Sequence, residues 1–158
     1  ADHSISIVEL QHIENQQSSQ EEAHWIAQAC QRLLEDYSMN SKEIGIMSPH
    51  RLQSNIILHE LKKKLSRKTT LPRIDTIERM QGTEFDLIFF SLSCSDKDLI
   101  HSAFLKSQHR FNVALTRARK KFILVASSFF FKSFPLDEKE LLQQEFFEKI
   151  YTANKSLH

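Results

Sequence analysis

The chain has 158 residues, of which 41% are hydrophobic and 26% charged, as expected of one globular domain with its own core. Its net charge of +1 is unevenly spread, because residues 44–132 carry sixteen basic and seven acidic side chains while residues 1–43 and 133–158 are acidic overall. No apolar run approaches the roughly 20 residues of a membrane-spanning helix. The basic centre suits an anionic partner, such as nucleic acid or nucleotide phosphate, or serves only solubility.

Apolar patterning predicts alternating strands and helices along the chain. Strands are expected at Ser4–Leu10 and at residues 44–47, 73–77, 86–93 and 122–127. Helices are expected after the capping sequence at residues 18–22, from Ser48-Pro49 with the proline in the first turn, from about His109 through the following basic run, and over residues 137–151. This order predicts a single α/β domain over residues 1–158, with its core at about 4–135. We expect a mostly parallel sheet flanked by helices, with functional groups at the carboxyl ends of its strands.

The chain has only two glycines, Gly45 and Gly82. A phosphate-binding P-loop needs at least two glycines within a few residues, followed by Lys and Ser or Thr. The chain therefore cannot cradle a triphosphate in that way by itself. Cys30 and Cys94 stand in apolar surroundings, and the eight histidines show no metal-ligand spacing. We expect buried free thiols, no protein-held metal and an intracellular, non-membrane protein without a signal peptide.

Three polar segments follow predicted strands: SPHRLQ from Ser48, ERMQGTE from Glu78, and HRFNVALTRAR from His109. In the last, Phe111, Ala114, Leu115 and Ala118 have the spacing of a helix face packed on a core. Arg117 falls on another face. Arginine stays charged at any working pH, and its planar fork matches phosphate oxygens. A solvated basic helix face is the alternative interpretation of this segment.

Taken together, the three segments resemble motifs IV, V and VI of the second RecA-like domain of superfamily 1 helicases. They most resemble the branch of the nonsense-mediated-decay helicase and senataxin. The resemblance covers roughly residues 4–135 and implies a P-loop NTPase fold without its own P-loop, within a longer helicase. It further implies that ATP with Mg²⁺ lies between this domain and an N-terminal RecA-like domain of the same chain, which supplies the P-loop and the magnesium-binding acids.

The resemblance also implies roles for individual residues. Arg117 stands at the position of the arginine finger that contacts the γ-phosphate, and is the expected catalytic residue. The expected ATP-binding residues are Arg51, Gln53, Gln81, Gly82, Glu84 and Arg117. Single-stranded DNA or RNA is expected to contact Ser48, Pro49, Thr76, Arg79 and Asn112, without readout of base sequence.

Three positions depart from the family pattern, one of them being Arg79, where relatives frequently have Ser or a similar residue. Some relatives carry a second phosphate-contacting arginine directly after the motif IV glutamine, where Ser54 stands here, and others carry it where Arg51 stands. Relatives often have an aromatic residue at His50. Two other functions stay open: a non-catalytic nucleic-acid-binding adaptor that keeps the fold, and the helicase part of a helicase-nuclease. Because the P-loop would lie in another domain, we expect the 158-residue chain alone to lack ATPase activity.

Overall fold

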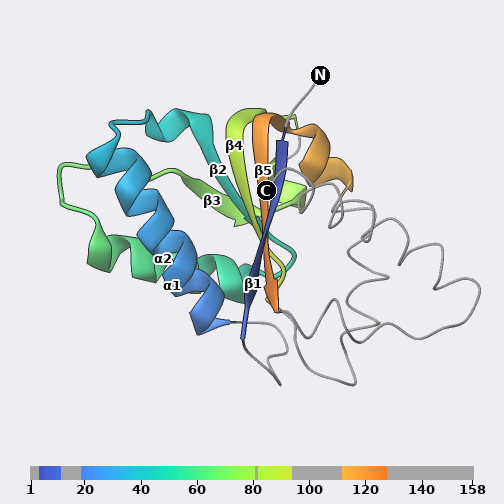
Figure 1. The fold of residues 1–158 in the computed structure, drawn as a ribbon, viewed down its shortest axis with the longest axis horizontal. Coiled ribbons are helices and arrows are strands. Elements are labelled where there is room, and N and C mark those ends of the chain that lie inside the picture. The colour runs from blue at the N-terminus through green and yellow to red at the C-terminus, as the bar shows by residue number, and fades with distance from the viewer. Residues whose placement is uncertain (1–3, 12–18, 81, 94–111, 128–158) are drawn as a thin grey trace, which may run out of the picture.

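The computed structural model describes residues 4–11, 19–80, 82–93 and 112–127. They contain one five-stranded sheet in the order β1-β5-β4-β2-β3, and every pair of neighbouring strands is parallel (Figure 1). The strands are β1 (Ser4–Leu10), β2 (Ile44–Ser48), β3 (Arg73–Thr76), β4 (Phe85–Ser91) and β5 (Ala118–Ser127). The predicted α/β class is therefore confirmed. Parallel pairing brings all carboxyl ends to one edge of the sheet, here called the carboxyl edge, and all amino ends to the opposite, amino edge.

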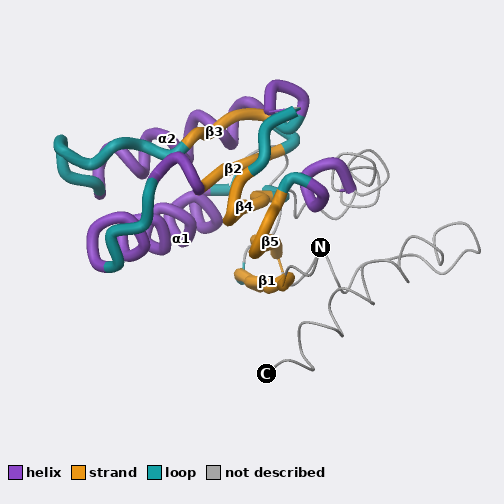
Figure 2. Tube along the Cα trace, turned by 90° about the horizontal axis from the view of Figure 1, so that it is seen from above, coloured by secondary structure: helices purple, strands orange, loops and turns teal. Residues whose placement is uncertain are grey.

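Two helices, α1 (Gln20–Gln31) and α2 (Arg51–Lys64), cover one face of the sheet (Figure 2). The predicted capping sequence starts α1, since Ser19 Oγ accepts a hydrogen bond from Glu22 N at 3.1 Å. The helices run side by side in the same direction, because Gln53 contacts Ser19 where both begin and Gln31 Nε2 donates to Lys64 O at 3.1 Å where both end. Their apolar sides bury a core against the sheet, in which Ile26, Ile57 and Leu61 of the helices pack with Phe89 of β4.

The opposite face is covered by shorter segments: the 3₁₀ turn Glu78–Met80 and a helical stretch at residues 112–116 (Figure 2). Met80 and Ala114 pack there against Phe90 and Phe122. β4 supplies side chains to both cores, with Phe89 on the α1 and α2 side and Phe90 on the other, both fully buried. This two-sided burial explains why β4 is an almost uninterrupted apolar run.

The helix predicted from about His109 is shorter than expected at its carboxyl end. Residues 112–116 are helical, Arg117 forms a turn, and Ala118 already begins β5. The helix stops because Ala118 pairs with Phe85 of β4, so the sheet ladder replaces the next helical turn. A smaller difference concerns α2: His50 is its N-cap and Arg51 its first residue, so Pro49 precedes the helix instead of lying in its first turn.

Several predictions lie outside the described residues. They are the start of the helix at 109–111, the buried thiol of Cys94 and the helix at 137–151. Within the described residues, no helix combines the length and the apolar character that crossing a membrane requires.

Candidate nucleotide and nucleic-acid sites

Arg117 lies at the amino edge, in the turn between the 112–116 helical stretch and β5. Its backbone is held on both sides: its N–H donates to Ala114 O at 3.0 Å, and its carbonyl accepts from Phe85 N at 2.9 Å. Its side chain is half-buried, and the buried Nε has no hydrogen-bond partner. A buried donor left unpaired costs about 1–3 kcal/mol. A ligand that accepted a hydrogen bond at this position would relieve that cost.

Gly82 and Glu84 belong to the same edge, because they lead directly into β4. Gly82 has a φ of +80°, which L side chains rarely adopt, and it is exposed with open space where a Cβ would lie. Glu84 is exposed. Arg73 holds this loop, since its guanidinium donates to Thr83 Oγ1 at 3.0 Å and to Arg79 O at 2.9 Å. Gln81, the remaining predicted residue of this loop, lies outside the described residues.

Ser48 and Thr76 lie at the carboxyl edge, directly opposite one another in the pairing of β2 with β3. Thr76 is partly exposed, whereas Ser48 and Pro49 are buried. Ser48 Oγ accepts from His50 N at 3.2 Å and so shapes the entry into α2. Arg51, the first residue of α2, is exposed, and its side chain forms no hydrogen bond or ion pair with a described residue. Of the predicted strand-binding residues at this edge, Thr76 therefore has surface available to a ligand.

The Gln53 side chain is fully buried and ties three segments together. Its Oε1 accepts from Ser19 N at 2.7 Å, and its Nε2 donates to Ser19 O at 2.9 Å and to Ser91 Oγ at 3.0 Å. Ser91 Oγ donates in turn to Glu22 Oε1 at 2.8 Å, which also accepts from Ser93 N at 3.0 Å. Gln53 thus joins the starts of α1 and α2 to the end of β4, and every polar atom of its side chain is used within the fold.

The predicted ATP-binding residues are consequently divided between two edges. The Arg117 carbonyl accepts a hydrogen bond from Phe85 N at the start of β4, and Gln53 Nε2 donates a hydrogen bond to Ser91 Oγ at its end. β4 has seven residues, so its ends lie about 20 Å apart. The structure brings together Arg117, Gly82 and Glu84, and separately Arg51 and Gln53 with the predicted strand-binding Ser48 and Thr76. Arg79 and Asn112 are exposed, on the 3₁₀ turn and the helical stretch respectively.

Sequence reasoning missed the ionic contacts of Arg119. Its Nε donates to Asp86 Oδ1 at 2.8 Å, and its Nη2 lies 2.6 Å from Glu43 Oε2. Lys120 Nζ lies 3.5 Å from Asp86 Oδ2. These contacts link β5, β4 and the turn before β2 at the amino edge, two residues beyond Arg117. The misassigned helix hid them, because on a helix Arg119 would not face Asp86.

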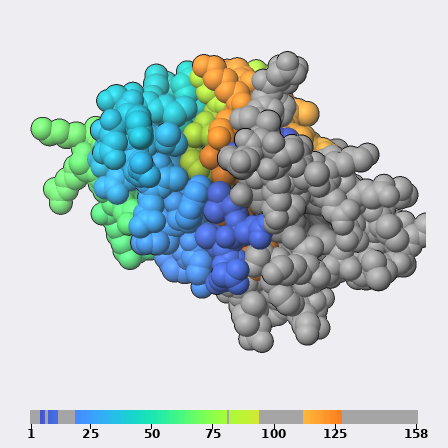
Figure 3. Space-filling model, viewed as in Figure 1, coloured from blue at the N-terminus to red at the C-terminus, as the bar shows by residue number. Residues whose placement is uncertain are grey.

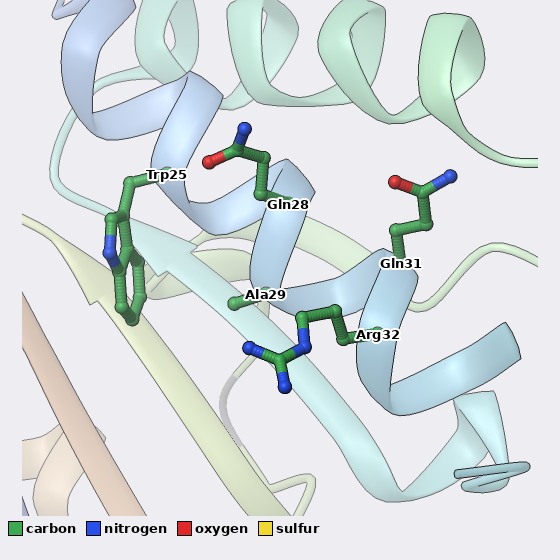
Figure 4. A pocket seen from close by; sticks show the side chains of 5 residues that line it. All are labelled: Trp25, Gln28, Ala29, Gln31 and Arg32. Atoms are coloured by element: carbon green, nitrogen blue, oxygen red, sulfur yellow. The ribbon is translucent and has the colours of Figure 1, made fainter. Parts of the chain in front are cut away.

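A cavity of about 410 Å³ lies beside α1 and is lined by Trp25, Gln28, Ala29, Gln31 and Arg32 (Figure 4). It contains none of the predicted site residues, and the Trp25 ring packs edge-on against Phe89 with centroids 6.2 Å apart. In the part of the chain that the structure describes, no group of three or more His, Cys, Asp or Glu side chains is placed to hold a metal ion.

Residues 4–128 match the AAA domain family. The helicase/nuclease JHS1 of Arabidopsis thaliana, named as an ATP-dependent DNA replication enzyme, is 39% identical over 108 residues, which are 67% of this chain and 8% of that protein. Mouse DNA2, with the same description, is 36% identical over 93 residues, or 59% of this chain and 8% of that protein. Helicase sen1 of Schizosaccharomyces pombe is 38% identical over 90 residues, or 53% of this chain and 5% of that protein.

The chain belongs to the AAA domain family, since the match covers most of its length. It is a helicase-family domain, homologous to part of the DNA2-type and sen1 helicases, and it spans less than a tenth of each of these three relatives. Among solved structures, the C-terminal domain of a possible DNA helicase from Lactobacillus plantarum WCFS1 aligns with 87% of this chain and 82% of that one, at 11% identity and a TM-score of 0.47.

Proposed function

We propose that this chain is the second RecA-like domain of an ATP-dependent superfamily 1 helicase and that it completes an ATP site formed with a preceding domain. Support comes from the three motif-like segments, from the family match over residues 4–128 and from relatives named as ATP-dependent helicases. The match to DNA2-type proteins as well as to sen1 favours this broader class over the nonsense-mediated-decay and senataxin branch alone.

The observation that carries the proposal is the state of Arg117. Its Nε is buried without a partner, while hydrogen bonds to Ala114 and Phe85 hold its backbone on both sides. An arginine on a held backbone with unused donor capacity suits phosphoryl transfer, in which catalysis depends on positioning and on neutralising the charge of the transferred group. Arg117 would bind γ-phosphate oxygens, and the Mg²⁺ that accompanies ATP would be held by the preceding domain.

The remaining roles follow the two edges of the sheet. Glu84 and the exposed Gly82 would line the nucleotide beside Arg117, together with Gln81. Thr76 would contact the phosphate backbone of a single strand of DNA or RNA at the carboxyl edge, with Ser48 and Pro49 shaping the polypeptide backbone there. Arg51 was expected to bind ATP, but it is exposed at this edge, and we propose that it contacts the nucleic acid instead. Gln53 would act indirectly, by holding this edge together, because no surface of its side chain is open.

The proposal is tested by measuring ATP hydrolysis with a protein extended to include the upstream domain, with and without single-stranded DNA or RNA. Arg117→Ala should lower kcat by about 10³-fold or more, and Arg117→Lys should recover little, since an ammonium lacks the planar fork. Lys121→Ala, which changes an exposed cation four residues away, is the matched control and should leave kcat unchanged. Equal turnover by wild type and Arg117→Ala would contradict the proposed finger.

The same assay addresses the other two functions. Strand binding without any turnover in the wild type would indicate a non-catalytic adaptor. The helicase part of a helicase-nuclease is favoured by one observation, that JHS1 and DNA2 are both named as helicase/nucleases. A nuclease centre would then lie outside the described residues, in which no metal-holding cluster occurs. Nuclease activity of the longer protein that persists in Arg117→Ala would support this version.

A further inference from the structure

A group of five cations surrounds the end of α2. Lys62, Lys63 and Lys64 form its last turn, and Arg67 and Lys68 follow in the connection to β3. We call residues 62–68 the basic turn. The connection after α2, green in Figure 3, projects from the left side of the molecule beyond the body of the domain. The basic turn belongs to none of the three motif-like segments.

The backbone of the basic turn is held in place by the last residue of α1 and by the π-helical turn Arg32–Asp36 that follows it. Glu35 Oε2 accepts from Ser66 N at 3.3 Å and from Thr69 Oγ1 at 3.2 Å. Gln31 Nε2 donates to Lys64 O at 3.1 Å, and Leu65 is buried with 8% of its surface exposed. Because the backbone is already ordered, a partner would lose less free energy to ordering this segment on binding.

The cations of the basic turn are largely without acidic partners. The ion pair that the described residues show here joins Lys63 Nζ to Glu60 Oε1 at 3.6 Å, and the same Glu60 oxygen also accepts from Gln20 at 2.7 Å. Glu35 bonds to the backbone and a hydroxyl instead of to a cation. Lys62, Arg67 and Lys68 are exposed and have no ion pair with any described residue. Their positive field is therefore not neutralised locally.

The positive surface continues along β3, the edge strand of the sheet. Arg73 begins β3 and donates to the carbonyl of Arg79 at 2.9 Å, and both arginines are exposed. Arg79 is one of the predicted strand-binding residues. Two further exposed arginines thus follow the basic turn along the chain, and Arg73 contacts the loop that sequence reasoning assigns to nucleic acid.

We propose that the basic turn binds the phosphate backbone of single-stranded nucleic acid, at nucleotides beyond those that the carboxyl edge of the sheet contacts. This inference rests on the proposed function. α2 has 14 residues, so about 21 Å separate its two ends, and a strand must extend beyond the carboxyl edge to reach the turn. A protein partner fits less well, since protein interfaces have an apolar centre and the exposed large hydrophobic residues of the described part, Tyr37 and Leu52, lie outside the turn.

The test measures binding of the 158-residue chain to single-stranded DNA by fluorescence anisotropy, over a range of salt concentrations, with one oligonucleotide of about 3 nucleotides, too short to span α2, and one of about 25. Arg67→Glu/Lys68→Glu is compared with Arg32→Glu/Lys42→Glu, which changes the net charge equally at exposed positions elsewhere. Circular dichroism confirms that both variants fold. A poly-glutamate peptide serves as a competitor.

The expected result is that Arg67→Glu/Lys68→Glu weakens binding of the long oligonucleotide by tenfold or more relative to the control pair. The slope of log K against log salt concentration should also become shallower, by the amount that corresponds to about one to two lost phosphate contacts. The short oligonucleotide should bind both variants alike. Equal binding of the long oligonucleotide by both variants would overturn the inference while leaving the proposed function intact. If a poly-glutamate peptide of the same total charge displaced the oligonucleotide equally well, the inference that the basic turn recognises phosphate groups would be wrong. Failure of the wild type to bind either oligonucleotide would contradict the proposed function itself.

Discussion

The guanidinium of Arg119 in β5 donates from Nε to Oδ1 of Asp86 in β4 at 2.8 Å, and so joins two neighbouring strands where both begin. The hydrogen bond from Arg119, with the nearby charges of Arg119 and Lys120, holds the pKa of the Asp86 carboxyl below its usual value of 3.8. Arg117, the proposed finger, precedes Arg119 by two residues in the chain, and its N–H donates to Ala114 O. The ion pair therefore stabilises the strand ends from which Arg117 extends.

The first prediction concerns the acid stability of the domain. Because the folded-state pKa of Asp86 is lower than its unfolded-state pKa, the stabilisation is present above the unfolded value of 3.8 and is lost as the pH falls through the folded-state pKa. Asp86→Asn should lower Tm at pH 7, and its difference from wild type should shrink below pH 3.8. Tm is measured against pH by circular dichroism.

Asp36→Asn is the control for this experiment, since Asp36 is exposed and forms no ion pair with a described residue. It should leave Tm at pH 7 close to the wild-type value. A Tm of Asp86→Asn equal to that of Asp36→Asn across the whole pH range would show that the Arg119 ion pair does not stabilise the fold. Added salt should reduce the effect, because the pair is partly exposed.

Gln53→Ala should destabilise the fold by about 2–4 kcal/mol, because it leaves the buried Ser19 N–H unpaired and opens a cavity, while the Ser19 carbonyl keeps its bond from Ala23 N. Gln53→Glu should also destabilise, since a carboxylate cannot donate to Ser91 and would approach the buried Glu22. Urea unfolding measures both, with Gln28→Ala on the exposed side of α1 as control. Wild-type stability combined with lost ATP binding in the extended protein would instead identify Gln53 as a direct nucleotide ligand.

Sequence patterns predicted the strands and the α/β class because these patterns are local: apolar residues recur every 2 residues in a half-buried strand and about every 3.6 residues in a helix. They could not show that Arg117 lies at the amino edge, since that depends on the helical stretch ending at residue 116 and on β5 beginning at Ala118. Ala114 and Ala118 both pack in one core and fit a continuous helix, but the pairing of Ala118 with Phe85, far away in sequence, ends the helix. The role of Gln53 was hidden for the same reason, because its partners are 34 and 38 positions away.

Cys30 should be inert toward thiol reagents in the folded chain. It is fully buried in the α1 and α2 core, and burial raises the pKa of its thiol to about 12. At pH 8 only about one molecule in ten thousand would carry the reactive thiolate. Labelling is measured in a Cys94→Ser background, where Cys30 should react only after urea is added. Rapid stoichiometric labelling without urea would contradict the buried placement.

The last prediction links packing at β2 to Arg117. A Cβ added to Gly45 would lie 2.6 Å from Phe85 Cδ2, and Phe85 N is the donor that holds Arg117 O at 2.9 Å. Gly45→Ala should therefore destabilise the domain by about 1–3 kcal/mol and lower kcat of the extended helicase, while Gly45→Ala/Phe85→Leu should recover part of both. Gly82→Ala is the comparison, since it meets no atom within 4 Å but requires a φ of +80°, and it should cost about 1 kcal/mol through backbone strain alone. Loss of stability in Gly45→Ala without any change in kcat would show that Phe85 supports the core but does not position Arg117.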